Sequence, residues 1–154
     1  MTLKERIVSD ITASMKARDT VRLGVVRMLK ARMQEAEVEK RAEKGAGYAL
    51  EDAEALAVIS AYAKQRRDSI EAYRQGGRED LAAKEEAELA IIQQYLPAQL
   101  SEADVRRLVS EAIAESAASS AKDMGAVMKL VMPKVKGVAD GKLVNQIVRE
   151  LLGQ

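Results

Sequence analysis

Residues 122–152 read KDMGAVMKLVMPKVKGVADGKLVNQIVRELL, and the interpretation of the whole chain starts from this stretch. Apolar residues recur in it at helical spacing on both sides of Gly137. Glycine commonly ends a helix, and Asp140 is of a residue type that caps the start of one. The stretch therefore predicts two short helices joined by a glycine turn, with basic residues on both.

The inward faces of these two helices follow from the same spacing. Ser120 or Asp123 is expected to cap the first helix. Its predicted buried face consists of Met124, Val127, Met128 and Val131. The predicted buried face of the second helix consists of Leu143, Val144, Ile147, Val148 and Leu151.

The sequence before this stretch predicts further amphipathic helices. Thr2 and Glu5 form a capping box, and Asp19 is suited to cap a second, longer helix that ends at Gly45. Two more helices are expected from about residue 51 to 75 and from about 79 to 95. The first helix is expected to place on one face Leu3, Ile7, Val8, Ile11 and Met15.

A domain boundary is expected at Leu96-Pro97. Proline disfavours helical geometry in the residue before it, so the fourth helix must end there. Ser101 and Asp104 then form a capping box that opens a fifth helix. No strand-like alternation is present. We predict an all-α protein with a helical N-terminal domain of about four helices, residues 1–96, and a compact three-helix C-terminal domain, residues 97–154.

Composition narrows the possible chemistry. The 154 residues include no Cys and no His, which removes disulfides, thiol nucleophiles, imidazole acid–base catalysis and the usual zinc ligands. No Glu cluster has the spacing of a metal site, so we expect neither a metal nor a cofactor. The N-terminus has no apolar leader, and no apolar run approaches the roughly 18 residues of a membrane span. These features predict a cytoplasmic protein that does not contact membranes.

The net charge of +1 conceals blocks of opposite sign. Residues 16–32 hold six bases and one acid, residues 35–54 hold seven acids and three bases, and residues 122–149 hold six bases and two acids. Such blocks suit a directed electrostatic surface, or helices that pair with one another. Ordinary solvated helix faces are the plainer alternative.

Two residues within 122–152 are costly in a helix. Gly125 is destabilising there by about 0.5–1 kcal/mol relative to alanine, which close approach of another helix or of a ligand would explain. Pro133 removes a helical hydrogen bond, so the helix is expected to bend or fray at that point.

The basic residues of the stretch suggest a phosphate-binding surface. Lys134 and Lys136 lie near the end of one predicted helix, and Lys142 lies at the start of the next. A helix N-terminus flanked by lysines suits phosphate, although Asp140 as a cap would occupy the same backbone N–H groups. Favourable interaction with the helix dipole is the alternative for the two earlier lysines. Asn145, Gln146 and Arg149 extend a basic, amide-rich face of the kind that contacts nucleic acid.

Catalysis has little support in the residues themselves. Ser119, Ser120 and Lys122 resemble a Ser/Lys nucleophile pair only in composition. They lie where a helix needs a cap, so we interpret them as structural. No self-sufficient catalytic site is recognisable.

Three segments carry a resemblance to a known family: residues 95–101 (YLPAQLS), 122–128 (KDMGAVM) and 136–142 (KGVADGK). In this order they resemble the YqeY family, which is similar to the C-terminal region of the B subunit, GatB, of the glutamine-dependent aspartyl/glutamyl-tRNA amidotransferase. The resemblance covers essentially the whole chain and is sharpest from Tyr95 onward.

The resemblance implies a two-part helical protein and a link to tRNA. In the amidotransferase the matching tail helps to hold tRNA, while other parts release ammonia from glutamine and activate the carboxylate with ATP. The family is labelled as carbon–nitrogen ligase with glutamine as amido donor, an activity not expected of this chain alone.

We therefore expect a tRNA-binding accessory protein related to the amidotransferase. The alternative is a protein-interaction module that docks on an amidotransferase or an aminoacyl-tRNA synthetase. The expected RNA contacts are Lys129, Lys134, Lys136, Lys142, Asn145 and Arg149. The residues expected to form turns or to allow close backbone approach are Gly125, Gly137, Asp140 and Gly141.

Overall fold

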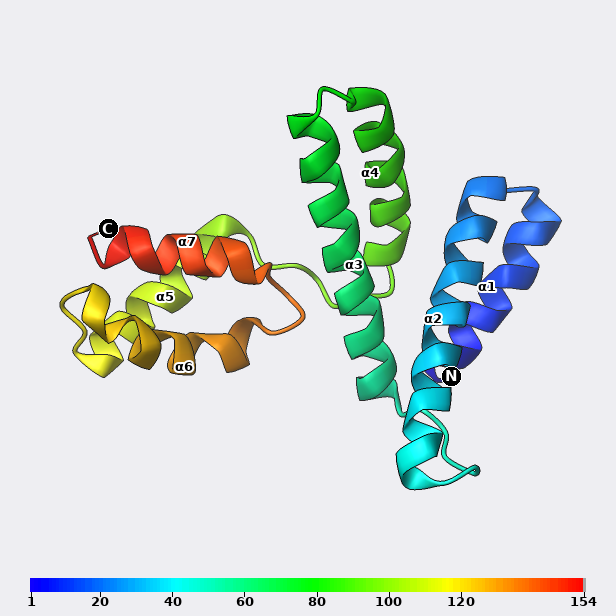
Figure 1. The fold of residues 1–154 in the computed structure, drawn as a ribbon, viewed down its shortest axis with the longest axis horizontal. Coiled ribbons are helices and arrows are strands. Elements are labelled where there is room, and N and C mark those ends of the chain that lie inside the picture. Colours follow the sequence, from blue (N-terminus) through cyan, green and yellow to red (C-terminus); the bar gives the residue numbers. More distant parts are fainter. Residues whose placement is uncertain (154) are drawn as a thin grey trace. The chain divides into compact units, whose positions relative to one another are not determined.

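The computed structural model describes residues 1–153 and confirms the all-α class (Figure 1). Over these residues the chain forms seven α-helices and one short 3₁₀ helix. They fall into two compact units, the first ending at Leu96 and the second starting at Pro97. In the described part of the chain, no helix is both long enough and apolar enough to cross a membrane.

The first unit consists of two helical hairpins (Figure 1). Helix α1 spans Leu3–Ala17 and α2 spans Thr20–Lys44, whereas α3 spans Asp52–Gln75 and α4 spans Glu79–Gln93. The α1–α2 and α3–α4 pairs each pack side by side, and α2 also packs against both α3 and α4. The four helices therefore enclose one core.

Local sequence signals set the helix ends as expected. Thr2 and Glu5 form the predicted capping box, and the backbone N–H of Arg22 donates to the Asp19 carboxylate over 3.0 Å. Helix α2 ends at Gly45, whose φ of 106° lies in the region that favours glycine. These helix ends are thus encoded within a few residues of where each helix starts or stops.

The core of the first unit contains neither Phe nor Trp, and medium-sized side chains fill it. Leu29, Met33, Ile59 and Ile92 are at most 1% exposed. Burial of aliphatic side chains contributes about 1.5–3 kcal/mol each, so the helices depend on this cluster more than on their own propensity.

The predicted inward face of α1 was partly wrong. Ile7 is buried as expected, but Val8 and Met15 are 44% and 54% exposed, and Ser14 is buried instead. The inward face is centred on residues 3, 7 and 14. Because Ser14 is polar, the spacing of apolar residues alone does not identify this face. Val8 and Met15 lie on the flank of the helix.

Tyr95 fastens the end of α4 to the first hairpin. The residue is only 4% exposed, and its hydroxyl donates a hydrogen bond to the carboxylate of Asp10 in α1. The Arg22 guanidinium in α2 donates to the side chain of Gln94 over 2.7 Å and lies 3.6 Å from the Asp10 carboxylate. Burial, and then the Asp10 carboxylate, raise the pKa of Tyr95 to about 12.

Glu37 is a buried charged residue of α2 that lies beside the start of α1. It accepts hydrogen bonds from the Lys4 ammonium and the Arg41 guanidinium at 2.7 Å each, and from the Leu50 backbone N–H at 3.0 Å. The Leu50 N–H, followed by Lys4, lowers the pKa of Glu37. This cluster joins the start of α1, the middle of α2 and the loop that leads into α3.

The second unit is a three-helix assembly. Helix α5 spans Glu102–Ser116, the 3₁₀ helix η1 spans Ala121–Asp123, α6 spans Met124–Val135 and α7 spans Gly141–Leu151. The predicted Ser101–Asp104 capping box is present at the start of α5.

The core of the second unit is rich in valine. Its buried residues are Val105, Val109, Ala112, Val127, Val131, Val135, Val144, Ile147, Val148 and Leu152. Leu151 was predicted to be buried, but it is 40% exposed and Leu152 is buried instead. Leu152 follows the last residue of α7, so helical spacing does not predict its burial.

We predict that Tyr95→Phe destabilises the protein by about 1–3 kcal/mol, because the substitution leaves Asp10 and Arg22 without the hydroxyl between them. The measurement is denaturant unfolding followed by circular dichroism. Tyr73→Phe is the matched control, since this half-buried ring belongs to the same core and its hydroxyl makes no hydrogen bond among residues 1–153. Equal destabilisation by both substitutions would contradict the proposed role of the Tyr95 hydroxyl.

The Glu37 cluster predicts an acid-sensitive stability. A carboxyl whose pKa is lower in the folded chain stabilises the fold above its unfolded pKa, here 4.5, and loses that contribution as the pH falls through the folded value. Glu37→Gln should therefore be less stable than wild type at pH 7 and should lose less stability below pH 4.5. Unfolding curves across this pH range test the prediction. Glu39→Gln, at an exposed position on the same helix, should follow the wild type.

Candidate functional site

The basic residues of α6 lie on two different sides of that helix. Gly125 and Lys129 lie on one face of α6, and Lys136, the residue that follows the helix, continues the same spacing; all three are exposed. Lys134 is also exposed, but at this helical spacing it lies well away from that face. The structure therefore divides the α6 lysines that the sequence grouped together.

On α7 the basic and amide residues share one face. Lys142 and Arg149 are seven residues apart, and both are exposed. Gln146 is exposed between them, and Asn145 is half-buried at the edge of the same face. The opposite side of α7 carries Val144, Ile147 and Val148, all fully buried, which holds the basic face outward.

The arginines of α5 are ion-paired, in contrast to four of the basic residues that follow them in sequence. Arg106 of α5 lies 3.0 Å from the Glu102 carboxylate and 2.7 Å from that of Glu150, and Arg107 lies 3.5 Å from that of Glu111. Within residues 1–153, by contrast, no ion pair involves any of Lys129, Lys134, Lys136 and Arg149. The unbalanced positive charge of the second unit therefore belongs to α6 and α7.

The turn between α6 and α7 is well anchored. Gly137 has a φ of 79°, which is the left-handed conformation typical of a glycine that follows a helix. The Leu100 backbone N–H donates to the Val138 carbonyl over 2.7 Å, and the Gln99 amide donates to the Gly137 carbonyl over 3.2 Å. The segment after Pro97 thus holds the turn, and with it the positions of Lys136 and Lys142.

The start of α7 carries its own cap. The Lys142 backbone N–H donates to the Asp140 carboxylate over 3.1 Å, as predicted for an N-cap residue. This carboxylate competes with any phosphate for the helix N-terminus. Any anion on this surface would depend on the lysine and arginine side chains.

Gly125 does not serve packing within the chain. A Cβ placed on Gly125 or on Gly141 would meet nothing within 4 Å. The interpretation in which another helix of this chain packs closely on Gly125 was therefore wrong. The space beside this residue opens to solvent.

Helix α6 continues past Pro133 to Val135. The missing N–H deprives the Lys129 carbonyl of its partner, but both residues are exposed and water can hydrate that carbonyl. The helix stops just before Gly137, where the sequence predicted its end.

The structure gives Ser119 and Ser120 a structural role. The backbone N–H groups of both donate to the Asp123 carboxylate, at 3.0 and 3.3 Å. Among the described residues, no group of three or more Asp or Glu could hold a metal ion.

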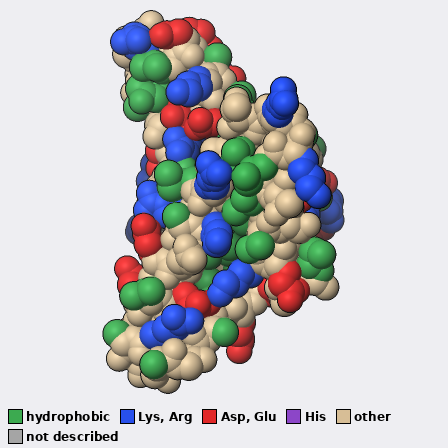
Figure 2. All heavy atoms as spheres, turned by 90° about the vertical axis from the view of Figure 1, so that its right-hand side faces the viewer, with side chains coloured by type: hydrophobic (Ala, Val, Ile, Leu, Met, Phe, Trp, Pro, Cys, Tyr) green, Lys and Arg blue, Asp and Glu red, His purple; other side chains and the backbone are tan. Residues whose placement is uncertain are grey.

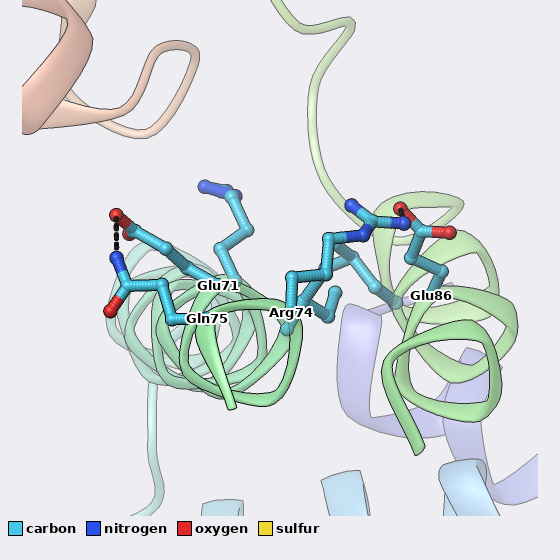
Figure 3. A pocket seen from close by; sticks show the side chains of 7 residues that line it. Glu71, Arg74, Gln75 and Glu86 are labelled. Carbon is cyan, nitrogen blue, oxygen red and sulfur yellow. Dashed lines mark hydrogen bonds and ion pairs between the residues drawn. The ribbon is translucent and has the colours of Figure 1, made fainter. Parts of the chain in front are cut away.

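A hollow of about 390 Å³ lies between α3 and α4, and the sequence did not predict it (Figure 3). Buried Ile70 and Leu89 line it, and Arg74 lies at its edge, 2.6 Å from the Glu86 carboxylate and 3.3 Å from that of Glu79. These residues come from two helices, so no local spacing reveals the hollow. Of the two arginines that line it, Arg67 and Arg74, the second is already neutralised, and we assign no binding role to the hollow.

Comparison with known proteins identifies relatives. A family model described as Yqey-like protein matches residues 4–152. The chain is 29% identical to Altered inheritance of mitochondria protein 41, mitochondrial, of Pyrenophora tritici-repentis, over 96% of this chain and 80% of the relative. The proteins of the same name in Eremothecium gossypii and Lachancea thermotolerans are both 33% identical, over 58% and 69% of this chain and 46% and 55% of their own length.

The names of these relatives contradict the cytoplasmic location expected from the sequence, because they are mitochondrial proteins. The expectation rested on the lack of an apolar leader, and that criterion concerns secretion alone. Mitochondrial targeting segments are amphipathic and rich in arginine, so a search for apolar runs does not detect them.

The two glycines of α6 and its turn should respond oppositely to alanine. Gly125→Ala should stabilise the protein by about 0.5–1 kcal/mol, because the new methyl meets open space within a helix. Gly137→Ala should destabilise it by about 1–2 kcal/mol, since an L-residue is strained at positive φ. Thermal unfolding of the two variants tests both signs. Destabilisation by Gly125→Ala would show that this position is not open.

Proposed function

The chain belongs to the YqeY-like protein family, and we propose that it is a tRNA-binding accessory protein related to the tRNA-dependent amidotransferases. The proposal assigns RNA contact to the outer faces of α6 and α7. The role is to hold tRNA, while the amide chemistry that the family label describes takes place on other proteins.

The unpaired cations of the second unit are the observation that carries the proposal. Lys129, Lys134, Lys136 and Arg149 project into solvent with no acidic partner among residues 1–153, and Lys142 is exposed beside them in sequence. An ion pair already present must be broken before its arginine or lysine can bind phosphate. Lys129, Lys134, Lys136 and Arg149 carry no such cost, which supports contact with a polyanion.

The chemistry of the surface favours folded RNA over single strands. It combines lysine and arginine with the side-chain amides of Asn145 and Gln146, which are suited to phosphate and sugar contacts. The sequence of the second unit contains no aromatic residue, and stacking on aromatic rings is the usual way to grip unpaired bases. The proposed contact is therefore with a duplex stem of the RNA, which the protein recognises by its shape and its sugar–phosphate backbone.

We predict that Lys129/Lys136→Ala and Lys142/Arg149→Ala each weaken binding to tRNA and reduce its salt dependence. The slope of log K against log salt should fall by about 0.7–0.9 for each phosphate that is no longer neutralised by a lysine or arginine. Filter binding at several salt concentrations provides the measurement. The two pairs test the α6 face and the α7 face separately.

Lys64/Lys84→Ala is the matched control, because it removes the same charge from exposed, unpaired lysines of the first unit. It should leave the slope unchanged. The proposal fails if wild type does not bind tRNA, or if the control lowers the slope as much as the α6 and α7 variants do.

A further inference from the structure

Two strips of side chains lie next to each other on the outer surface of the α1–α2 hairpin. On α1, the strip contains Lys4, Val8, Ile11 and Met15, spaced four, three and four residues apart. On α2, the same spacing selects Leu23, Arg27, Lys30 and Gln34, and the buried Glu37 follows at the end of the strip. We call the surface formed by these two strips the hairpin groove.

Contacts at both ends show that the two strips are neighbours. The Arg27 guanidinium lies 4.0 Å from the Met15 sulfur, and the Lys4 ammonium lies 2.7 Å from the Glu37 carboxylate. Because the helices are antiparallel, these two contacts fix the alignment of everything between them. Ile11 of α1 therefore lies opposite Lys30 of α2, and Val8 lies opposite Gln34.

The hairpin groove exposes apolar surface. Val8 and Met15 are 44% and 54% exposed, and Ile11 and Leu23 are half-buried. In Figure 2 hydrophobic side chains form a band on the face that α1 and α2 turn toward the viewer, with Lys and Arg side chains on both sides of it. Contiguous exposed apolar surface with a polar rim is typical of an interaction site.

The uncompensated charge of the hairpin groove is positive. Arg27 and Lys30 make no ion pair among residues 1–153. The carboxylate of Glu37, at the far end, is already neutralised by Lys4 and Arg41. An occupant of this groove gains from apolar contact along its length and from negative charge near the Arg27 end.

We propose that the hairpin groove binds an acidic amphipathic helix of a partner protein. A groove between two antiparallel helices accommodates a third helix, whose apolar residues would lie on Val8, Ile11 and Met15. Methionine adapts its shape to different partners, which suits Met15 to such a contact. Carboxylates on the same helix would pair with Arg27 and Lys30.

Other occupants fit less well. Nucleic acid would make no use of the exposed Val8 and Met15 side chains. A membrane surface favours aromatic anchors beside the basic residues, and the sequence of α1 and α2 has none. A second copy of this chain is the remaining alternative, and the oligomeric state of Met15→Glu tests it.

A synthetic helical peptide provides the probe. It consists of about three heptads with leucine along one face and glutamate elsewhere, and it is titrated into the isotope-labelled full chain and followed by NMR. We expect saturable shift changes confined to α1 and α2. The comparison peptides carry lysine in place of glutamate, or serine in place of leucine, and both should bind at least about tenfold more weakly.

Two substitutions locate the site. Met15→Glu and Arg27→Glu should each weaken binding of the acidic peptide about tenfold or more, and the exposure of both residues keeps the fold intact. Val38→Glu is the matched control, at an apolar residue of α2 that is 64% exposed and lies outside the groove. It should bind as wild type does.

The inference is overturned if the serine peptide binds as tightly as the leucine peptide, or if Val38→Glu weakens binding as much as Met15→Glu. Preferential binding of phosphatidylserine vesicles at this face, or self-association that Met15→Glu abolishes, would also overturn it in favour of another occupant. Binding of tRNA should be unchanged in Met15→Glu, which separates this test from that of the proposed function.

Discussion

The hydrogen bond from the Tyr95 hydroxyl to the Asp10 carboxylate is the interaction on which the first unit depends most. It joins the residue that follows α4 to the middle of α1, while Arg22 adds α2 to the same cluster. Arg6 completes the enclosure, since its guanidinium lies 4.8 Å from the centre of the Tyr95 ring and donates to the Gln94 carbonyl over 3.1 Å. Packing of medium-sized aliphatic residues is not directional, so it would let the helices slide against one another. The hydrogen bonds of this buried polar cluster are directional and set how the two hairpins pack.

The two units differ in how many of their charged side chains form ion pairs between helices. In the first unit, cations and carboxylates meet across helices, as Arg66 does with Glu85 and as Lys4 does with Glu37. These pairs join consecutive helices, α3 to α4 and α1 to α2. In the second unit, Arg106 of α5 pairs with Glu150 of α7, and a core rich in valine holds the helices together. Lys129, Lys134, Lys136 and Arg149 make no ion pair among residues 1–153, which is why the proposed function places RNA there.

Sequence reasoning succeeded where the signal is local. The capping residues Thr2, Asp19 and Asp140 and the turn glycines depend on neighbours within four residues, so the sequence alone predicts them. The prediction of buried faces from apolar spacing failed at buried polar residues. Ser14 and Glu37 lie on inward faces where the apolar pattern predicts neither, and Glu37 gains its partners from α1 and from a loop. The basic surface was predicted in composition but not in geometry, because helical spacing separates Lys134 from Lys129 and Lys136 only once the exact helix bounds are known.

The distribution of aromatic residues has a practical consequence for spectroscopy. The sequence contains four tyrosines and no tryptophan, and all four tyrosines, at positions 48, 62, 73 and 95, belong to the first unit. Near-ultraviolet absorbance and intrinsic fluorescence therefore report on the first unit only. A tryptophan introduced into the second unit would give that half an optical signal of its own, against a background of tyrosine emission from the other half.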